Sequence, residues 1–224
     1  MKTKKIVIVG DSAFAEIAYE YFEADTEYQV AAFAVESAHL TKNKLFGIPI
    51  IAFETLEQSY PPAEYDIFVA IPYTQLNRLR TRLAAEAKAR GYTLASYISP
   101  RAFIWPNSKI GEHCFIFEDN TIQPFVNIGE NVILWSGNHI GHHSIIRNNC
   151  FISSHTVVSG FCDIGENSFL GVNSTISNNV VLGKNNWIGP SVTIYKSTQD
   201  NMLYNIPKLD ASDVSSLRFF KIQE

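Results

Sequence analysis

The stretch DIGENSFLGVNSTISNNVVLG, residues 163–183, decides the fold of this 224-residue chain. An aliphatic side chain returns at every sixth position within it. These positions are Ile164, Leu170, Ile176 and Leu182. The spacing continues in both directions without a break, so that Ile, Leu or Val fills every sixth position from Ile98 to Ile194. A short fixed period of this length is typical of a solenoid, in which each repeat buries its apolar side chains against the next.

A second register supports the first. The residue four positions after each aliphatic is never charged, aromatic or long, and all three cysteines of the chain fall there. Seven of the 12 glycines directly follow the aliphatic residue. This pattern resembles the hexapeptide repeat of left-handed parallel β-helices, in which the aliphatic and the small residue point inward and three hexapeptides make one coil. With 18 residues per coil, residues 98–195 would form about five and a half coils.

The first 97 residues follow a different pattern, in which apolar β-branched runs alternate with segments of helical spacing. We expect strands at 5–9, 29–35, 48–51, 66–71 and 93–98, and helices at 13–22 and 74–90. Alternating strands and helices indicate a parallel sheet covered by helices, here a small Rossmann-like domain. The sequence therefore predicts an α/β domain over 1–97, a β-solenoid domain over 98–195, and a tail over 196–224 in which the period is lost.

Composition excludes several classes of function. The chain is 46% hydrophobic and 18% charged, with a formal net charge of −4, so it lacks the basic surface of a nucleic-acid binder. Its apolar runs are too short for a membrane span, and its N-terminus leads into a strand rather than a signal peptide. Three cysteines without paired spacing suit a reducing cytoplasm. Their place in the small register predicts buried, inert thiols rather than a nucleophile or metal ligand.

Three histidines cluster in the segment Gly137–Ser144, at His139, His142 and His143. None of the five histidines of the repeat region falls in an inward register, which predicts that none is a core residue. One coil later, Gly160 comes directly above His142. A glycine at that corner would leave its backbone N–H unobstructed beside an imidazole, and a base next to an oxyanion donor suits acyl transfer. The alternative is an exposed corner that accepts any polar residue.

Three loops at the carboxyl ends of the expected parallel strands hold the candidate ligand-binding residues of the N-terminal domain. Gly10, Asp11 and Ser12 form a strand-to-helix turn, where helix N–H groups can receive a phosphate. Glu36 ends the second strand, where such folds often place an acid against a ribose or base, and Asn77 lies in the polar turn after the fourth strand. The first turn has a single glycine and so lacks the dinucleotide fingerprint. A simple turn, an exposed acid and a helix cap are the alternative interpretations.

The combination of a short Rossmann-like domain and hexapeptide coils resembles the sugar O-/N-acyltransferases. That family includes sialic acid O-acetyltransferases and bacterial nucleotide-aminosugar N-acetyltransferases. The segments Ser99–Gly111, His139–His143 and Asp163–Asn173 carry the resemblance, which covers nearly the whole chain. It implies that His142 is the catalytic base and that the Gly160 N–H lies beside the acetyl group.

The resemblance also implies the partners. Acetyl-CoA, the acyl donor, would run along the groove between adjacent subunits of a homotrimer, against Gly171 and Gly189. Residues 1–97 would hold the nucleotide of the sugar. Lys196 and Lys208 in the tail are candidates for the CoA phosphates, with solvated lysines as the alternative. No metal is expected.

The chain departs from the family pattern at several positions. His143 stands where the family often has a Glu that orients the base, so His143 joins the catalytic candidates. Phe151 replaces a second active-site histidine of some members. The first turn reads Gly10-Asp-Ser-Ala-Phe14 in place of Gly-x-Gly-Gly-His, and only Glu36 remains of a usual acidic pair. These changes weaken the nucleotide assignment more than the assignment of the base.

Our leading hypothesis is an acetyl-CoA-dependent N-acetyltransferase acting on the amino group of a nucleotide-linked deoxyaminosugar in bacterial surface-glycan biosynthesis. O-acetylation of a sugar hydroxyl is the nearest alternative, since residue types do not separate the two. A non-catalytic binding or assembly protein and a metal-dependent β-helix enzyme such as a carbonic anhydrase are the other classes.

Overall fold

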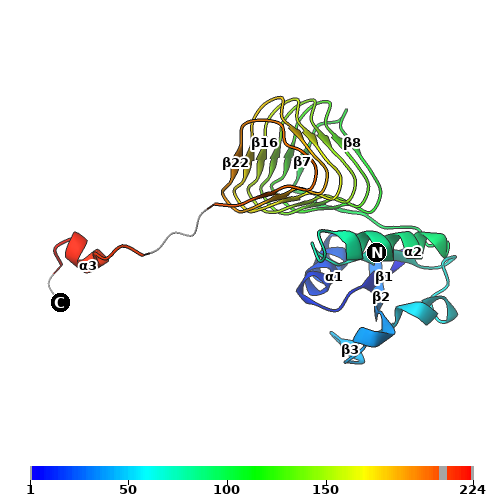
Figure 1. The fold of residues 1–224 in the computed structure, drawn as a ribbon. Helices are drawn as coiled ribbons and strands as arrows, with labels where there is room; N and C mark the ends of the chain where they lie inside the picture. Colours follow the sequence, from blue (N-terminus) through cyan, green and yellow to red (C-terminus); the bar gives the residue numbers. More distant parts are fainter. Residues whose placement is uncertain (1, 207–210, 223–224) are drawn as a thin grey trace.

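The computed structural model describes residues 2–206 and 211–222, in two parts that pack against each other (Figure 1). The first part is a five-stranded sheet in the order β3-β4-β2-β1-β5. Its strands are β1 (Lys4–Val9), β2 (Tyr28–Val35), β3 (Lys44–Leu45), β4 (Ile48–Ala52) and β5 (Asp66–Val69). All neighbouring strands are parallel except the β3–β4 pair. The expected Rossmann-like sheet is therefore present, with one antiparallel edge strand that the sequence did not reveal.

Helices cover both faces of this sheet because the residues of β1 alternate between two cores. Ile6 and Ile8 pack in the cluster of helix α1 (Ala13–Asp25), and Val7 and Val9 pack in the cluster of helix α2 (Arg78–Ala89). Two short 3-10 helices, η1 (Ser37–His39) and η2 (Phe53–Gln58), complete the region. No described helix has the length and apolarity needed to cross a membrane.

Helix α2 begins later than the sequence predicted. A start at Thr74 was expected, but Gln75, Leu76 and Asn77 all have positive φ values, and the helix begins at Arg78. L-residues in the left-handed region cannot belong to a right-handed helix. The expected strand at 93–98 is also reduced, to a single bridge between Leu94 and Ile67 and to the first strand of the coil.

The second part is a left-handed parallel β-helix built from two-residue strands, one on every hexapeptide. Strands 18 residues apart stack in register, as in the pairing of Ile122 with Ile140. The first face holds β6 (Tyr97–Ile98), β9 (Phe115–Ile116), β12 (Ile133–Leu134), β15 (Phe151–Ile152), β18 (Phe169–Leu170), β21 (Trp187–Ile188) and β23 (Leu203–Tyr204). The second holds β7 (Phe103–Ile104), β10 (Thr121–Ile122), β13 (His139–Ile140), β16 (Val157–Val158), β19 (Thr175–Ile176) and β22 (Thr193–Ile194). The third holds β8 (Lys109–Ile110), β11 (Asn127–Ile128), β14 (Ile145–Ile146), β17 (Asp163–Ile164) and β20 (Val181–Leu182).

The periodic aliphatics form one continuous core inside the coil, as the sequence predicted. Strand pairing runs past the last hexapeptide, because β23 pairs with β21. The tail also contains a short helix, α3 (Ser216–Phe219).

One face of the coil is apolar on its outside as well, and we call it the docked face. Its outward residues pack with helix α1 in a single buried cluster, so the N-terminal part lies along this face (Figure 1). These outward residues are Phe115, Ile133, Phe151, Phe169 and Trp187. The two remaining faces therefore meet at the edge of the coil opposite the N-terminal part.

Candidate functional site

That opposite edge carries the histidine pair, and we call it the histidine edge. It consists of the corner residues 123–126, 141–144, 159–162 and 177–180, between the face of β13 and the face of β14. His142 and His143 are both exposed there. The backbone N–H of His142 donates to Oε1 of Gln123 on the preceding coil, at 2.9 Å. The corner therefore presents two imidazoles on a backbone that is fixed by the coil beneath it.

Gly160 lies against the ring of His142, as the spacing predicted. A Cβ at position 160 would come 2.8 Å from Cε1 and 2.9 Å from Nε2 of His142, so a side chain there would displace the ring. The expectation of an unobstructed N–H is wrong, however, because the Gly160 N–H donates to Oδ1 of Asn178 at 2.9 Å. The same link recurs on another edge, where Asn148 accepts from the N–H of Glu130 one coil earlier. Gly160 thus supplies space beside the base rather than a free donor.

The second imidazole, that of His143, is held between two aromatic rings. Its ring stacks on Phe125 with centroids 4.5 Å apart and on Phe161 with centroids 4.8 Å apart. Its Nδ1 lies 3.2 Å from Nδ1 of His142. Because His142 Nδ1 faces its neighbour, Nε2 is the nitrogen of His142 left to meet a substrate.

The N-terminal candidates gather in one pocket at the carboxyl edge of the sheet. Gly10, Asp11, Ser12 and Glu36 all line it. His39 lines it too. So do Leu79 and Leu83 from the apolar face of α2, neither of which was among the sequence candidates. The apolar spacing of that helix was visible in the sequence, but its contact with the first turn was not.

The first turn of this pocket requires glycine. Gly10 has a φ of +127°, and a Cβ there would lie 2.9 Å from the carbonyl oxygen of Ala70. Ser12 precedes α1 as its N-cap residue, without a side-chain capping bond. Two ion pairs flank the pocket, Lys42 with Asp11 at 3.4 Å and Arg82 with Glu36 at 2.9 Å.

Asn77 does not join the pocket. Its side chain is fully buried, and Nδ2 donates to the carbonyl oxygens of Asn167 and Ser168 on the coil. The expectation that Asn77 binds substrate is therefore wrong, because α2 packs on an edge of the coil and buries this turn. We call this contact between α2 and the coil the junction. The sequence showed a polar turn but not the surface that covers it.

Arg80 is the central residue of that junction, and the sequence did not reveal it. Its guanidinium is fully buried and donates to Oδ1 of Asn131 at 3.0 Å and to backbone carbonyls of both parts of the chain. The carbonyl acceptors belong to Ile71, Pro72, Asn131, Asn149 and Cys150. Burial lowers the pKa of the guanidinium to about 9. No carboxylate bonds to it within the described chain, so backbone carbonyls and the side-chain amide oxygens of Asn131 and Asn77 stabilise the buried charge.

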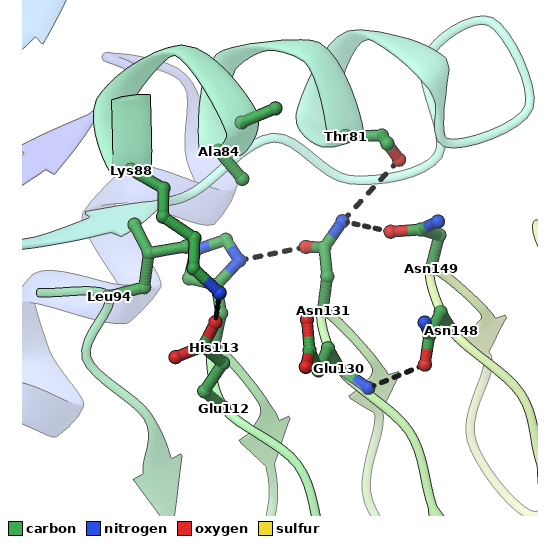
Figure 2. A pocket seen from close by; sticks show the side chains of 11 residues that line it. Thr81, Ala84, Lys88, Leu94, Glu112, His113, Glu130, Asn131, Asn148 and Asn149 are labelled. Atoms are coloured by element: carbon green, nitrogen blue, oxygen red, sulfur yellow. Dashed lines mark hydrogen bonds and ion pairs between the residues drawn. The ribbon is translucent and has the colours of Figure 1, made fainter. Parts of the chain in front are cut away.

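His113 is buried in the same junction, so the prediction that no coil histidine is buried is wrong for this residue. Its Nε2 accepts from the N–H of Val69 at 2.9 Å. Its Nδ1 bonds to Oδ1 of Asn131 at 2.9 Å (Figure 2). Burial, reinforced by nearby Arg80, lowers the pKa of His113 to about 3. His113 does lie outside the interior of the coil, as its spacing predicts, but α2 and β5 cover that corner.

Figure 2 shows the small cavity beside this junction, between α2 and the coil. Asn131 lies at its centre and bonds to Asn149 as well as to His113, while Lys88 pairs with Glu112 at the rim. These groups satisfy one another across the junction. The cavity therefore belongs to the packing of the two parts and not to the histidine edge.

The cysteines behave as the sequence predicted. Cys114, Cys150 and Cys162 are free and buried. Burial raises the pKa of all three thiols, to about 12 for Cys114 and Cys150. A thiol held neutral in this way is a poor nucleophile. Among the described residues, no group of three His, Cys, Asp or Glu side chains is arranged to hold a metal ion.

The candidates for binding CoA lie on a different edge from His142. Gly171 and Gly189 are buried corner residues between the docked face and the face of β19 and β22. The packing of the next coil already requires a glycine at position 171, because a Cβ there would come 2.6 Å from the backbone nitrogen of Pro190. Lys196 is exposed just after β22, and Lys208 lies outside the described residues.

Comparison with known proteins agrees with this architecture. The family model of the GMPPB C-terminal domain matches residues 93–203, which span the coil. No curated protein sequence matches significantly.

Several solved structures are similar over nearly the whole chain. The acetyltransferase domain of PglB from Neisseria gonorrhoeae FA1090 superposes with a TM-score of 0.80 at 23% identity, over 90% of this chain and 96% of that one. A mutant of perosamine N-acetyltransferase from Caulobacter crescentus, solved with CoA and GDP-perosamine, gives 0.78 at 24% identity, over 89% and 92%. WeeI from Acinetobacter baumannii AYE gives 0.70 at 18% identity, over 90% and 96%. The chain therefore has the fold of these proteins, in which an N-terminal α/β domain precedes a left-handed β-helix, as the sequence predicted.

Proposed function

We propose that this protein is an acetyl-CoA-dependent N-acetyltransferase that acts on the amino group of a nucleotide-linked deoxyaminosugar in bacterial surface-glycan biosynthesis. The observation that carries the proposal is the exposed imidazole of His142, with Nδ1 against His143 and the ring against Gly160. The fold adds support, since the perosamine N-acetyltransferase with this fold was solved with CoA and GDP-perosamine.

His142 acts as the general base in this mechanism. Its Nε2 takes a proton from the sugar ammonium or from the tetrahedral adduct as the amine nitrogen attacks the thioester carbonyl. The C–N bond forms, the C–S bond breaks, and coenzyme A leaves as the thiol, because its sulfur takes the proton back from His142. The second proton that an ammonium substrate must lose goes to solvent. No cysteine takes part, since burial raises the pKa of all three thiols. The Gly160 N–H is not assigned to the oxyanion, because Asn178 already accepts from it.

Residues 1–97 would then hold the nucleotide of the sugar, in the pocket lined by Gly10, Asp11, Ser12 and Glu36. Residues 98–195 would carry the acyl-transfer site, and acetyl-CoA would lie along the coil toward the tail, 196–224, near Gly189 and Lys196. Cytoplasmic location is part of the proposal, because the three free thiols suit a reducing compartment.

The proposed active form is a homotrimer with sites between subunits. In one chain the nucleotide pocket belongs to the part packed on the docked face, whereas His142 lies on the opposite edge of the coil. Within one chain, the pocket and His142 are therefore separated by the width of the coil. A second copy that brings its own pocket to the histidine edge would complete it.

The test is acetyl transfer by His142→Ala and His142→Asn. We expect kcat to fall by about 10²–10⁴-fold, the usual contribution of a general base. Thermal unfolding and CoA binding should stay unchanged, because the side chain is exposed and contacts only the exposed rings of His143 and Phe161. Near-wild-type turnover in either variant would remove His142 from the mechanism.

The acceptor is tested separately with amino-bearing and hydroxyl-bearing nucleotide sugars, GDP-perosamine among them. Mass spectrometry should find an amide product. An ester product from the hydroxyl sugars alone would establish the O-acetyltransferase instead, and no CoA binding at all would point to a non-catalytic protein.

A further inference from the structure

The corners of the coil reveal an unusual pair of residues on the histidine edge. Over residues 109–194, all of which the structure describes, one residue at each corner has a positive φ. Asn, Asp, Gly, His and Ser fill almost all of these positions, as expected, since they tolerate the left-handed region best. The two exceptions are Phe125 and Phe161, with φ values of 64° and 57°. A bulky side chain at such a φ is strained, so these two residues need another reason to be there.

Burial does not supply that reason. Phe125 is 53% exposed and Phe161 is 54% exposed, so neither fills the core of the coil. What they share is the residue between them. Each lies one coil away from His143, one before and one after, and both rings stack on its imidazole. The two phenylalanines therefore fix the plane of the His143 ring.

In that plane, Nδ1 of His143 faces Nδ1 of His142, the proposed base. The two Nδ1 atoms are 3.2 Å apart, a distance at which one nitrogen donates and the other accepts. Only one proton can lie between them. If His142 Nδ1 carries it, His142 Nε2 keeps its lone pair and can act as the base, whereas the opposite arrangement leaves the Nε2 position protonated in neutral His142.

We propose that His143 is a positioning residue that holds His142 in the Nδ1–H tautomer, and that Phe125 and Phe161 clamp His143 in that role. This inference rests on the proposed function of His142 for its kinetic consequence. In this arrangement His143 carries a proton on Nε2 and accepts the hydrogen bond through Nδ1. When His142 Nε2 takes the substrate proton, the resulting imidazolium donates a stronger bond to the same acceptor, and no proton passes to His143.

The first test removes the acceptor without disturbing the column of rings. His143→Phe continues the stack between Phe125 and Phe161 but has no nitrogen. We expect kcat to fall by about 10–100-fold with the KM for acetyl-CoA within about twofold, as for other residues that orient a reacting side chain. His143→Glu supplies a carboxylate acceptor and should recover most of the loss. Wild-type kcat in His143→Phe would overturn the proposal.

The second measurement does not depend on turnover. Imidazole ¹⁵N shifts of histidine-labelled protein, with His142 assigned by its absence in His142→Asn, report which nitrogen carries the proton. We expect the Nδ1–H form in the wild type and loss of that preference in His143→Phe. An Nε2–H form in the wild type would overturn the inference, whereas an Nδ1–H form in a protein without acetyl transfer would leave it standing and reject the proposed function.

The third test addresses the clamp. The double variant Phe125→Asn/Phe161→Asn places a residue that favours positive φ at both corners, so the coil should remain at least as stable. We expect kcat to fall by several-fold and the Nδ1–H preference of His142 to weaken. Phe46→Asn is the matched control, since Phe46 also has a positive φ (51°) and an exposed ring stacked on Tyr19 in the N-terminal part. Equal effects of the double variant and this control would reject the clamp.

Discussion

Two glycines of the histidine edge show how one residue type serves different purposes. A Cβ at Gly141 would lie 2.6 Å from the backbone carbon of Ser159 on the next coil. A Cβ at Gly160 would instead meet the side chain of His142, 2.8 Å from Cε1. Backbone atoms in a stacked coil cannot move aside, whereas an exposed imidazole can rotate. Gly141 is therefore required by the fold, and Gly160 by the position of the base.

Alanine at these two positions should separate stability from activity. Gly141→Ala should destabilise the coil by about 1–3 kcal/mol, the usual cost of overpacking. Gly160→Ala should unfold near the wild-type temperature but lose at least about tenfold in kcat, because a displaced base misses its substrate. Thermal melts and acetyl-transfer rates of both variants check this. A Gly160→Ala protein with full activity would show that the ring position does not matter.

At the scale of elements, α2 joins the two parts of the chain. Its buried face carries Arg80, whose donors satisfy carbonyls on the sheet side and on the coil. Its exposed face carries Arg82, two residues further on, which pairs with Glu36 and Glu86 in solvent. The two arginines therefore share a helix and a charge but differ in burial.

Methionine substitutions should distinguish the two arginines. Arg80→Met leaves several buried carbonyls without a donor, and we expect the free energy of unfolding to fall by at least about 3 kcal/mol. Arg82→Met removes only exposed ion pairs and should cost at most about 1 kcal/mol. Urea denaturation of both variants provides the comparison. Equal losses would mean that the carbonyl cluster contributes nothing specific.

The period of each element determined how much of it could be predicted. The hexapeptide register placed the coil strands from β6 to β22 and all three cysteines, because inward positions repeat every six residues. The burial of the junction residues Asn77, Arg80 and His113 was not predicted, because it depends on which face the N-terminal part covers. A second period held that information. The residue before each aliphatic is large and apolar at every 18th position of the docked face, from Phe115 to Trp187, and polar residues interrupt the same position on the other two faces.

The candidate site was harder to predict than the fold. Spacing located His142 and brought Gly160 against its ring, because stacking in a regular coil follows from counting residues. It could not show that Asn178 accepts from the Gly160 N–H, or that Phe125 and Phe161 enclose His143, since these contacts depend on side-chain conformation. Spacing also could not show that the Asn77 side chain points toward the coil, because the left-handed residues before α2 redirect the chain there.

At the scale of the whole molecule, the decisive feature is the distance between the two halves of the proposed site. The pocket of Gly10 and Ser12 belongs to the part that covers the docked face. His142 lies on the edge between the other two faces. If the site forms between subunits, each chain supplies the pocket of one site and the base of another.

Mixing two inactive variants tests this arrangement. Ser12→Tyr fills the mouth of the pocket without removing a capping bond, since Ser12 makes none, and keeps His142. His142→Ala keeps the pocket. Each homo-oligomer should be inactive, but random co-assembly of equal amounts should place an intact pocket against an intact base in about a quarter of the sites of a cyclic oligomer. Acetyl transfer should therefore return to about a quarter of the wild-type rate per chain after joint refolding. Mixing without refolding is the control and should restore nothing while subunits do not exchange. No recovery in co-assembled protein that still binds CoA would place pocket and base in the same chain, which the separation across the coil opposes.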